Sequence, residues 1–192
     1  MILSTTGTKE LQAKINDIVK KQLPFAASVA LNNTAVDVKK GVERQLQQDI
    51  DKPTPFTQKA FAIHRSSKSR LMSAVYIKPI QAAYLKPQIL GGRRVAAKGK
   101  PILIPGNATR KDKHGNLPRG KIARLQSQGK IFKDGRLILE KMARKNRGLA
   151  YSAKDASYKP RFKFYERAKS TAIKVFERHL QKSLTHAIKT AR

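Results

Sequence analysis

The residues in this sequence that could do chemistry are few and lie far apart. Of the four histidines, His179 and His186 are seven positions apart, so on a helix they would share one face. Two helical turns would separate them by about 10 Å, which favours partly buried or interface histidines over a pair of metal ligands. The twelve Asp and Glu residues are scattered and form no cluster at metal-binding spacing.

One stretch has part of a phosphate-binding motif. Gly99-Lys100 resembles the end of a phosphate-binding loop, but its first glycine is missing and Pro101 stands where Ser or Thr would follow the lysine. The sequence contains no cysteine, which excludes disulfides, thiolate zinc ligands and cysteine nucleophiles. We therefore predict no catalytic residue, no metal site, no cofactor and no small-molecule substrate, and we do not expect an enzyme.

The charge balance is the strongest signal in the composition. Lys and Arg number 42 and Asp and Glu 12, which gives a formal net charge of +30 over 192 residues. Such an excess favours a polyanionic partner, which would be nucleic acid, an anionic membrane surface or an acidic protein ring. Hydrophobic residues make up 40% of the chain but aromatic ones only 6%, so we expect a modest aliphatic core whose burial is completed by assembly.

No targeting or membrane signal is visible in the sequence. The N-terminus lacks the basic start and long apolar run of a signal peptide. No window has the length of a transmembrane helix. We therefore expect a soluble chain that has no membrane partner and needs no oxidising compartment.

The predicted fold class is α+β, in a single domain over residues 1–192. Residues 1–52 are predicted to be a helical N-terminal part, with one helix at about 8–22 and a longer helix from 24 to 51. Residues 158–192 are predicted to form a long C-terminal helix with Pro160 in its first turn. This last helix has a narrow apolar stripe on one face and basic residues on the other.

Between these helical parts, residues 56–153 have the alternation and turn signals of an antiparallel sheet with long basic inserts. Two hairpins and two further strands are predicted, at 59–65 with 71–78, 130–132 with 137–139, 101–105 at a sheet edge, and 149–153. Three shorter features are also predicted: a single helical turn at 79–85 that Pro87 closes, a short helix at 121–128, and a lead into the last helix at 155–159.

Residues 106–120 are predicted to be an extended arm. The segment is made of charged and turn-forming residues, with Leu117 as an apolar exception. Loops of this length are uncommon in compact domains and are usually functional or disordered. An arm that orders on an adjacent subunit and a flexible surface loop are both consistent with the sequence. The residues expected to make the inter-subunit contact are Arg110, Lys111, Lys113 and Arg119.

Basic residues are most concentrated between Arg93 and Arg124. Release of counter-ions from phosphates would favour nucleic-acid binding by such a stretch regardless of base sequence. No zinc-finger spacing, RNP motif or basic region before a heptad repeat is present, so we expect contact with the backbone and not with the bases. The residues predicted to contact DNA or an acidic partner are Arg93, Arg94, Arg167, Lys174, Arg178 and Lys182.

Three short stretches carry a resemblance to a known family. Residues 25–35 resemble an alanine-rich early helix with an Ala-Leu-Asn run, and residues 100–106 resemble a central strand that precedes a basic insert. Residues 161–168 resemble the entry to the closing helix of phage neck proteins. In these stretches, and in its size and basicity, the chain resembles the minor tail protein Z family of lambda-like phages. This family belongs with the tail-completion, or head-to-tail joining, proteins of tailed bacteriophages.

The resemblance implies a structural virion protein, a subunit of a head-to-tail connector ring in the neck that surrounds the genome-exit channel. Its implied partners are further copies of itself in a homo-oligomeric ring, portal or adaptor proteins, tail-tube proteins, and genomic DNA in the channel. The implied location is the virion tail or neck, after assembly in the host cytoplasm. The alternative is a free-standing nucleic-acid-binding protein without sequence specificity, associated with the ribosome or the nucleoid.

Overall fold

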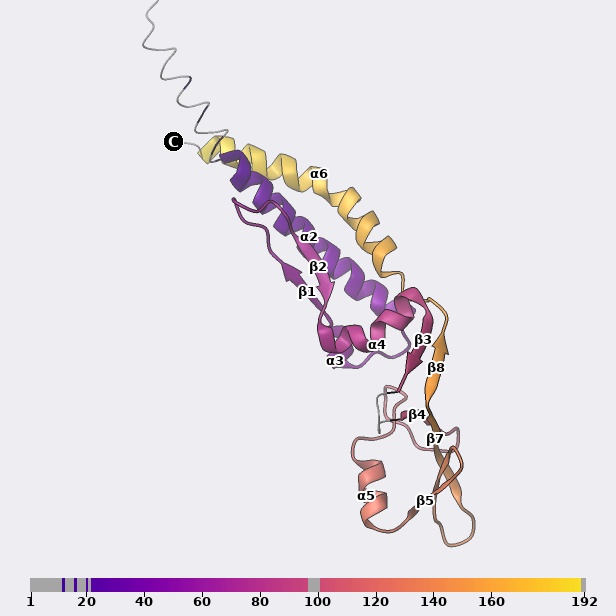
Figure 1. Ribbon diagram of the computed structural model, residues 1–192. Coiled ribbons are helices and arrows are strands. Elements are labelled where there is room, and N and C mark those ends of the chain that lie inside the picture. The colour runs from indigo at the N-terminus through magenta and orange to yellow at the C-terminus, as the bar shows by residue number, and fades with distance from the viewer. Residues whose placement is uncertain (1–11, 13–15, 17–19, 21, 97–100, 191–192) are drawn as a thin grey trace, which may run out of the picture. The chain divides into compact units, whose positions relative to one another are not determined.

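The computed structural model describes residues 12, 16, 20, 22–96 and 101–190 (Figure 1). Its fold is α+β, as predicted, with a long N-terminal helix and a long C-terminal helix that pack together. The helix predicted at about 8–22 lies almost wholly outside the described residues. In chain order the elements are α2 (Leu23–Asp49), α3 (Pro55–Gln58), β1 (Phe61–His64), β2 (Ala74–Ile77), α4 (Pro79–Leu90), β3 (Gly92–Val95), β4 (Ile102–Pro105), α5 (Lys121–Ser127), β5 (Ile131–Asp134), β6 (Leu137–Glu140), β7 (Arg147–Ala153), β8 (Asp155–Tyr158) and α6 (Phe164–Thr190).

The described chain divides into two compact units. The helical unit holds the described residues up to Leu46, together with Lys59–Pro79 and the residues from Lys163 onward. The sheet unit holds Gln47–Gln58 and Ile80–Phe162. The single domain over residues 1–192 stays a prediction.

In the helical unit, α2 and α6 run side by side (Figure 1). The buried face of α2 is formed by small and aliphatic side chains that recur at helical spacing, which include Ala30, Val38, Val42 and Leu46. Gly41 makes a close approach possible, because a Cβ at this position would lie only 2.9 Å from Thr171 Oγ1 on α6. The long helix predicted from residue 24 is therefore confirmed, and its buried face packs against α6.

The first predicted hairpin is also confirmed. Strands β1 and β2 pair antiparallel, with Phe61 opposite Ile77. The Asn32 side chain on α2 holds the connection between the strands: its amide donates to Ser66 O at 3.1 Å and its Oδ1 accepts from Ser66 N at 2.8 Å. Phe61 stacks on Phe164 of α6 with 5.8 Å between ring centroids. The hairpin is thus tied to both long helices.

The sheet unit contains a four-stranded antiparallel sheet in the order β4-β7-β6-β5 and a two-stranded ribbon of β3 and β8. Its core is a cluster of Leu125 from α5 with Ile138, Leu149 and Ala150 from the sheet. The predicted hairpin of β5 and β6 is present with Asp134 opposite Leu137, so its loop has only two residues. Strand β4 lies at a sheet edge, as its flanking prolines predict.

The prediction for residues 79–87 is wrong about where the helix ends. α4 continues through Pro87 to Leu90 instead of forming a single turn. Pro87 lacks an N–H and so removes one intrahelical hydrogen bond, and the helix extends only three residues beyond it. The helix ends at Gly91, whose φ of 72° leaves the helical region. Gly91 N donates to Pro87 O at 2.9 Å, which closes the last turn.

The predicted start of the last helix is also wrong. Residues 155–158 form strand β8, which pairs with β3 in the register that sets Gly92 opposite Tyr158. Pro160 then packs on Gly91, where an added Cβ would lie 2.9 Å from Pro160 Cδ. Arg161 N donates to Gln88 O at 2.8 Å, which holds the segment in the sheet unit. α6 therefore begins only at Phe164.

Residues 106–120, all of which the structure describes, contain neither helix nor strand, as predicted. Two positions nevertheless fold against their own sheet. Thr109 is buried, and its hydroxyl lies 2.8 Å from Gly148 O and 2.9 Å from Leu149 O. Leu117 packs against the Leu125 core cluster. The segment is thus anchored near both of its ends, so only the turns between these anchors project.

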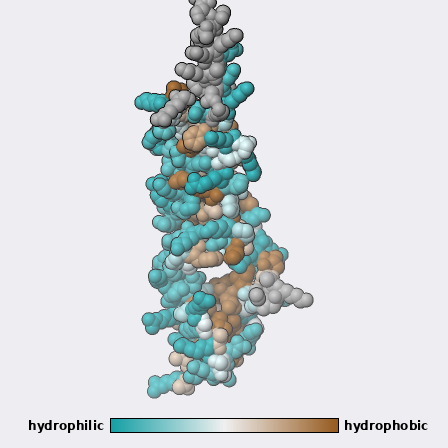
Figure 2. Space-filling model, turned by 90° about the vertical axis from the view of Figure 1, so that its left-hand side faces the viewer, coloured by the Kyte–Doolittle hydropathy of each residue, from teal (hydrophilic) through white to brown (hydrophobic). Residues whose placement is uncertain are grey.

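Within the residues that the structure describes, no helix has both the length and the apolar character needed to cross a membrane. Hydrophilic residues cover most of the face drawn in Figure 2, and hydrophobic residues gather there in smaller patches.

Candidate functional site

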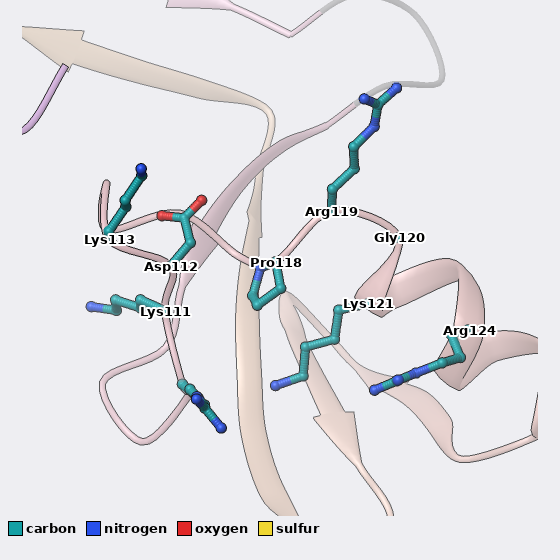
Figure 3. A pocket seen from close by; sticks show the side chains of 9 residues that line it. Lys111, Asp112, Lys113, Pro118, Arg119, Gly120, Lys121 and Arg124 are labelled. Carbon is teal, nitrogen blue, oxygen red and sulfur yellow. The ribbon is translucent and has the colours of Figure 1, made fainter. Parts of the chain in front are cut away.

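The sheet unit has a cavity of about 790 Å³ that is lined almost entirely by basic side chains (Figure 3). We call it the cationic basin. One side is formed by the segment 110–113 and the other by the chain from Pro118 into α5. Six cations line it against a single carboxylate, that of Asp112. The cations are Arg110, Lys111, Lys113, Arg119, Lys121 and Arg124.

The carboxylate of Asp112 has a structural role. Its Oδ1 accepts hydrogen bonds from His114 N and Asn116 N, each at 2.8 Å. Asp112 N in turn donates to Asn116 O at 2.8 Å, and Gly115 has a φ of 81° between them. Such a turn is what an Asx residue followed by glycine favours. The turn fixes the direction of the chain between the two sides of the basin. Two of its hydrogen bonds are accepted by the Asp112 carboxylate, which is the one negative charge in the lining of the basin.

The second side of the basin comes from the start of α5. Lys121 and Arg124 are three residues apart and therefore share one face of the helix. Leu125, also on α5, is buried in the core of the sheet unit and holds the helix in place. In Figure 3, Lys121 and Arg124 extend in the same direction, toward the segment that carries Lys111, whereas Arg119 points to the other side of the chain.

The basin retains its positive charge. Within the described part of the chain, no carboxylate forms an ion pair with any of its six cations. Two other basic side chains of the sheet unit do form ion pairs: Arg147 binds Glu140 at 2.5 Å, and Arg93 binds Asp155 at 2.5 Å. The six basin cations are thus available to a negatively charged ligand.

The structure places all four predicted arm residues in the basin, but it separates the other predicted contact residues. Arg93 and Arg94 are exposed on β3 in the sheet unit, whereas the remaining four lie on α6 in the helical unit. Arg93 is occupied by Asp155. Its hydrogen bond to that carboxylate raises the pKa of Arg93 and lowers the pKa of Asp155. Arg94 has no such partner among the described residues.

On α6, the predicted contact residues differ in their surroundings. Lys174 and Lys182 are exposed. Arg178 lies 3.6 Å from Asp37 Oδ2 on α2, and its side chain is still 71% exposed. Arg167 is half-buried, and its Nε has no hydrogen-bond partner among the described residues. These residues therefore present a basic helix face that is partly used inside the helical unit.

The helical unit also has an apolar groove, with a volume of about 530 Å³, between α2 and α6. Tyr165 and Ile173 on its α6 side are 63% and 70% exposed. The hydroxyl of Thr34 on its α2 side is buried and has no hydrogen-bond partner in the described structure. The main apolar residues of the groove are Leu31, Ala35, Val38, Ala172, Ile173 and Phe176. The stripe predicted on the last helix is therefore only partly covered by its own unit.

Sequence reasoning found part of this arrangement and missed the rest. Lys121 and Arg124 belong to the basic stretch between Arg93 and Arg124. Their spacing on a short helix is the one sequence signal that could have placed them beside the cations of residues 106–120. Thr34 gives no signal in the sequence. Of the two histidines on α6, His179 binds Asp37 inside the helical unit. Among the described residues, no three His, Cys, Asp or Glu side chains are placed to hold a metal ion.

The fold and its surfaces define an α+β protein with a cationic basin and an uncovered apolar groove. No family model, curated protein or solved structure matches the chain. The resemblance to the tail-completion proteins therefore stays a hypothesis, and it enters the function below only as a proposal.

Proposed function

We propose that this chain is a structural subunit of a tailed-phage virion, which forms a head-to-tail connector ring in the neck around the genome-exit channel. Its partners would be further copies of itself, portal or adaptor proteins on the capsid side, and tail-tube proteins on the other. Its work would be to join these parts and not to catalyse a reaction.

The observation that carries this proposal is the apolar groove between α2 and α6. A helix with an apolar stripe is stable in water when that stripe is buried. Here Ile173 is 70% exposed, and it lines a groove that also contains the unpartnered hydroxyl of Thr34. Contiguous exposed apolar surface of this kind is typical of protein–protein contact sites. A neighbouring subunit that covers the groove would complete the burial.

The net charge of +30 supports assembly with negatively charged neighbours. Copies of so basic a chain repel one another at low ionic strength, so a ring of this chain alone would be favoured by salt. Acidic neighbouring rings or DNA in the channel would supply the same neutralisation in a virion. The expected increase of ring assembly with salt concentration is opposite to the salt dependence of nucleic-acid binding, which salt weakens.

Sedimentation of the full chain at rising salt concentration tests the assembly. We expect a defined ring-sized species at high salt, and we expect Ile173→Glu to abolish it by placing a charge in the groove. The matched control is Ile80→Glu, because Ile80 is also 70% exposed but lies on α4, outside the groove. Equal effects of the two substitutions would remove the groove from the proposal.

The identity of the neighbours needs a second experiment. Co-expression with the portal and tail-tube proteins of the same genome should give a complex that purifies as one species. Mass spectrometry of purified virions should detect this chain. A chain that stays monomeric with every neck and tail component, and that is absent from virions, would contradict the proposed function.

A further inference from the structure

We propose that the cationic basin is a binding site for the phosphodiester backbone of nucleic acid, which it recognises without reading the bases. The sequence assigned Arg110, Lys111, Lys113 and Arg119 to a contact between subunits. The structure gathers these four with Lys121 and Arg124 around one cavity, which is a reason to assign them to a phosphate ligand instead. This inference does not depend on ring assembly.

The first argument is charge. Six cations line the basin, and its one carboxylate already accepts two backbone hydrogen bonds at 2.8 Å. Cations gathered this closely repel one another, and within the described residues no acidic side chain pairs with them. A polyanion relieves this repulsion, and the counter-ions released from its phosphates add to the binding free energy.

The second argument is what the lining contains besides charge. Pro118 is its one large apolar side chain, and none of the nine lining residues is aromatic. Protein–protein interfaces have an apolar centre with few charged residues, so an acidic protein surface fits the basin poorly. Binding through stacked bases needs aromatic platforms, which this lining lacks. Contact with phosphates alone fits both observations.

The third argument is that the two sides of the basin are held in place. The segment 110–113 is fixed by the buried Thr109 before it and by the Asp112 turn within it. Lys121 and Arg124 stand on a helix that Leu125 anchors in the core. Cations carried on an anchored backbone lose less conformational entropy on binding than cations on a free arm do. In addition, the guanidinium group of each of Arg110 and Arg124 can donate two parallel hydrogen bonds to a phosphate.

The test is fluorescence anisotropy of the full chain with a random-sequence DNA duplex of about 20 base pairs over a range of salt concentrations. The variant Lys111→Gln/Lys121→Gln removes one cation from each side of the basin. If each lysine contacts one phosphate, the slope of log K against log salt should fall by about 2, and binding at about 0.1 M salt should weaken roughly 50-fold. Circular dichroism should show an unchanged melting curve, because Lys111 is exposed and the half-buried Lys121 forms no ion pair among the described residues.

The matched control is Lys40→Gln/Lys189→Gln, which removes the same charge from exposed positions of α2 and α6 that are assigned to no binding surface. We expect its slope and affinity to stay close to those of the unaltered chain. Equal losses in the two variants would overturn the inference, because binding would then be diffuse. A competition experiment distinguishes an acidic protein ligand from nucleic acid. If poly-glutamate of similar length displaces the labelled duplex as strongly as unlabelled DNA does, the inference is overturned in favour of an acidic protein ligand. The comparison of the variants and the competition experiment can both be interpreted even if the chain does not form rings.

Discussion

His179 Nε2 on α6 lies 2.8 Å from Asp37 Oδ2 on α2, although the two residues are 142 positions apart in the chain. The same carboxylate oxygen lies 3.6 Å from the guanidinium of Arg178. Both partners of the short contact are partly buried, with side-chain exposures of 17% for His179 and 29% for Asp37. This carboxylate is therefore a polar link between the two long helices.

Replacing Asp37 tests that link. Asp37→Ala should lower the free energy of unfolding of the full chain by about 1–2 kcal/mol, because it removes a partly buried hydrogen bond to a charged group. Urea denaturation followed by circular dichroism measures the change. Asp51→Ala is the control, since Asp51 is exposed and its loss changes the net charge equally. Equal stability of the two variants would show that Asp37 contributes nothing to the packing of α2 on α6.

A second prediction concerns Gly41, where the backbone of α2 lies close to the Thr171 side chain on α6. Gly41→Leu should destabilise the chain by about 1–3 kcal/mol. Even an added Cβ would lie only 2.9 Å from Thr171 Oγ1, so the larger leucine side chain must separate the helices. Leucine has the higher helix propensity, so on local grounds alone the substitution would stabilise α2. The control Gln48→Gly on the exposed side of α2 measures the size of that local difference, because Gln and Leu have nearly equal helix propensities. A Gly41→Leu variant that is more stable than the unaltered chain would contradict the close approach.

The local parts of this fold could be predicted from the sequence because their signals are local. The β5–β6 hairpin has a turn residue, Gly135, between two alternating runs, and the β1–β2 hairpin has the same pattern with a longer connection. The ribbon of β3 and β8 could not be predicted in the same way. It joins residues that are 60 to 66 positions apart, and Arg93 and Arg94 show no alternation that would mark a strand.

The same distinction applies to the candidate site. The charge of the arm is plain in the sequence, and its four cations all line the basin. The two cations that complete the basin, Lys121 and Arg124, lie on α5. The position of α5 depends on the packing of Leu125 in the core of the sheet unit, and no local sequence pattern shows that core. The partner of His179 was also beyond sequence reasoning, because a lone aspartate on a helix gives no indication of what it faces.

A third prediction concerns the anchor of the loop that carries the basin. Thr109→Val removes the hydroxyl that reaches Gly148 O and Leu149 O and leaves a carbonyl of β7 without this donor. We expect a loss of about 1–3 kcal/mol in the free energy of unfolding, and faster hydrogen exchange in residues 106–113. Thr109→Ser keeps the hydroxyl and should retain most of the stability. A Val variant as stable as the Ser variant would show that the loop is not held by this hydrogen bond.

The last prediction concerns pH and the ribbon of β3 and β8. The hydrogen bond from Arg93, at 2.5 Å, lowers the pKa of Asp155 below its usual range. A carboxylate whose pKa is lowered by folding stabilises the fold above its unfolded pKa, and this contribution is lost as pH falls through the folded value. Asp155→Asn should therefore speed hydrogen exchange at Ala96 N, which donates to Lys154 O beside the pair, at neutral pH.

Below the folded pKa of Asp155 the variant and the unaltered chain should exchange alike, because the carboxyl group is then protonated in both the folded and the unfolded states. Asp134→Asn is the control, since Asp134 is exposed at the end of β5 and forms no ion pair among the described residues. It should leave exchange at Ala96 unchanged at every pH. A difference between Asp155→Asn and the unaltered chain that persists at acidic pH would mean that the side chain supports the ribbon through its shape and not through its charge.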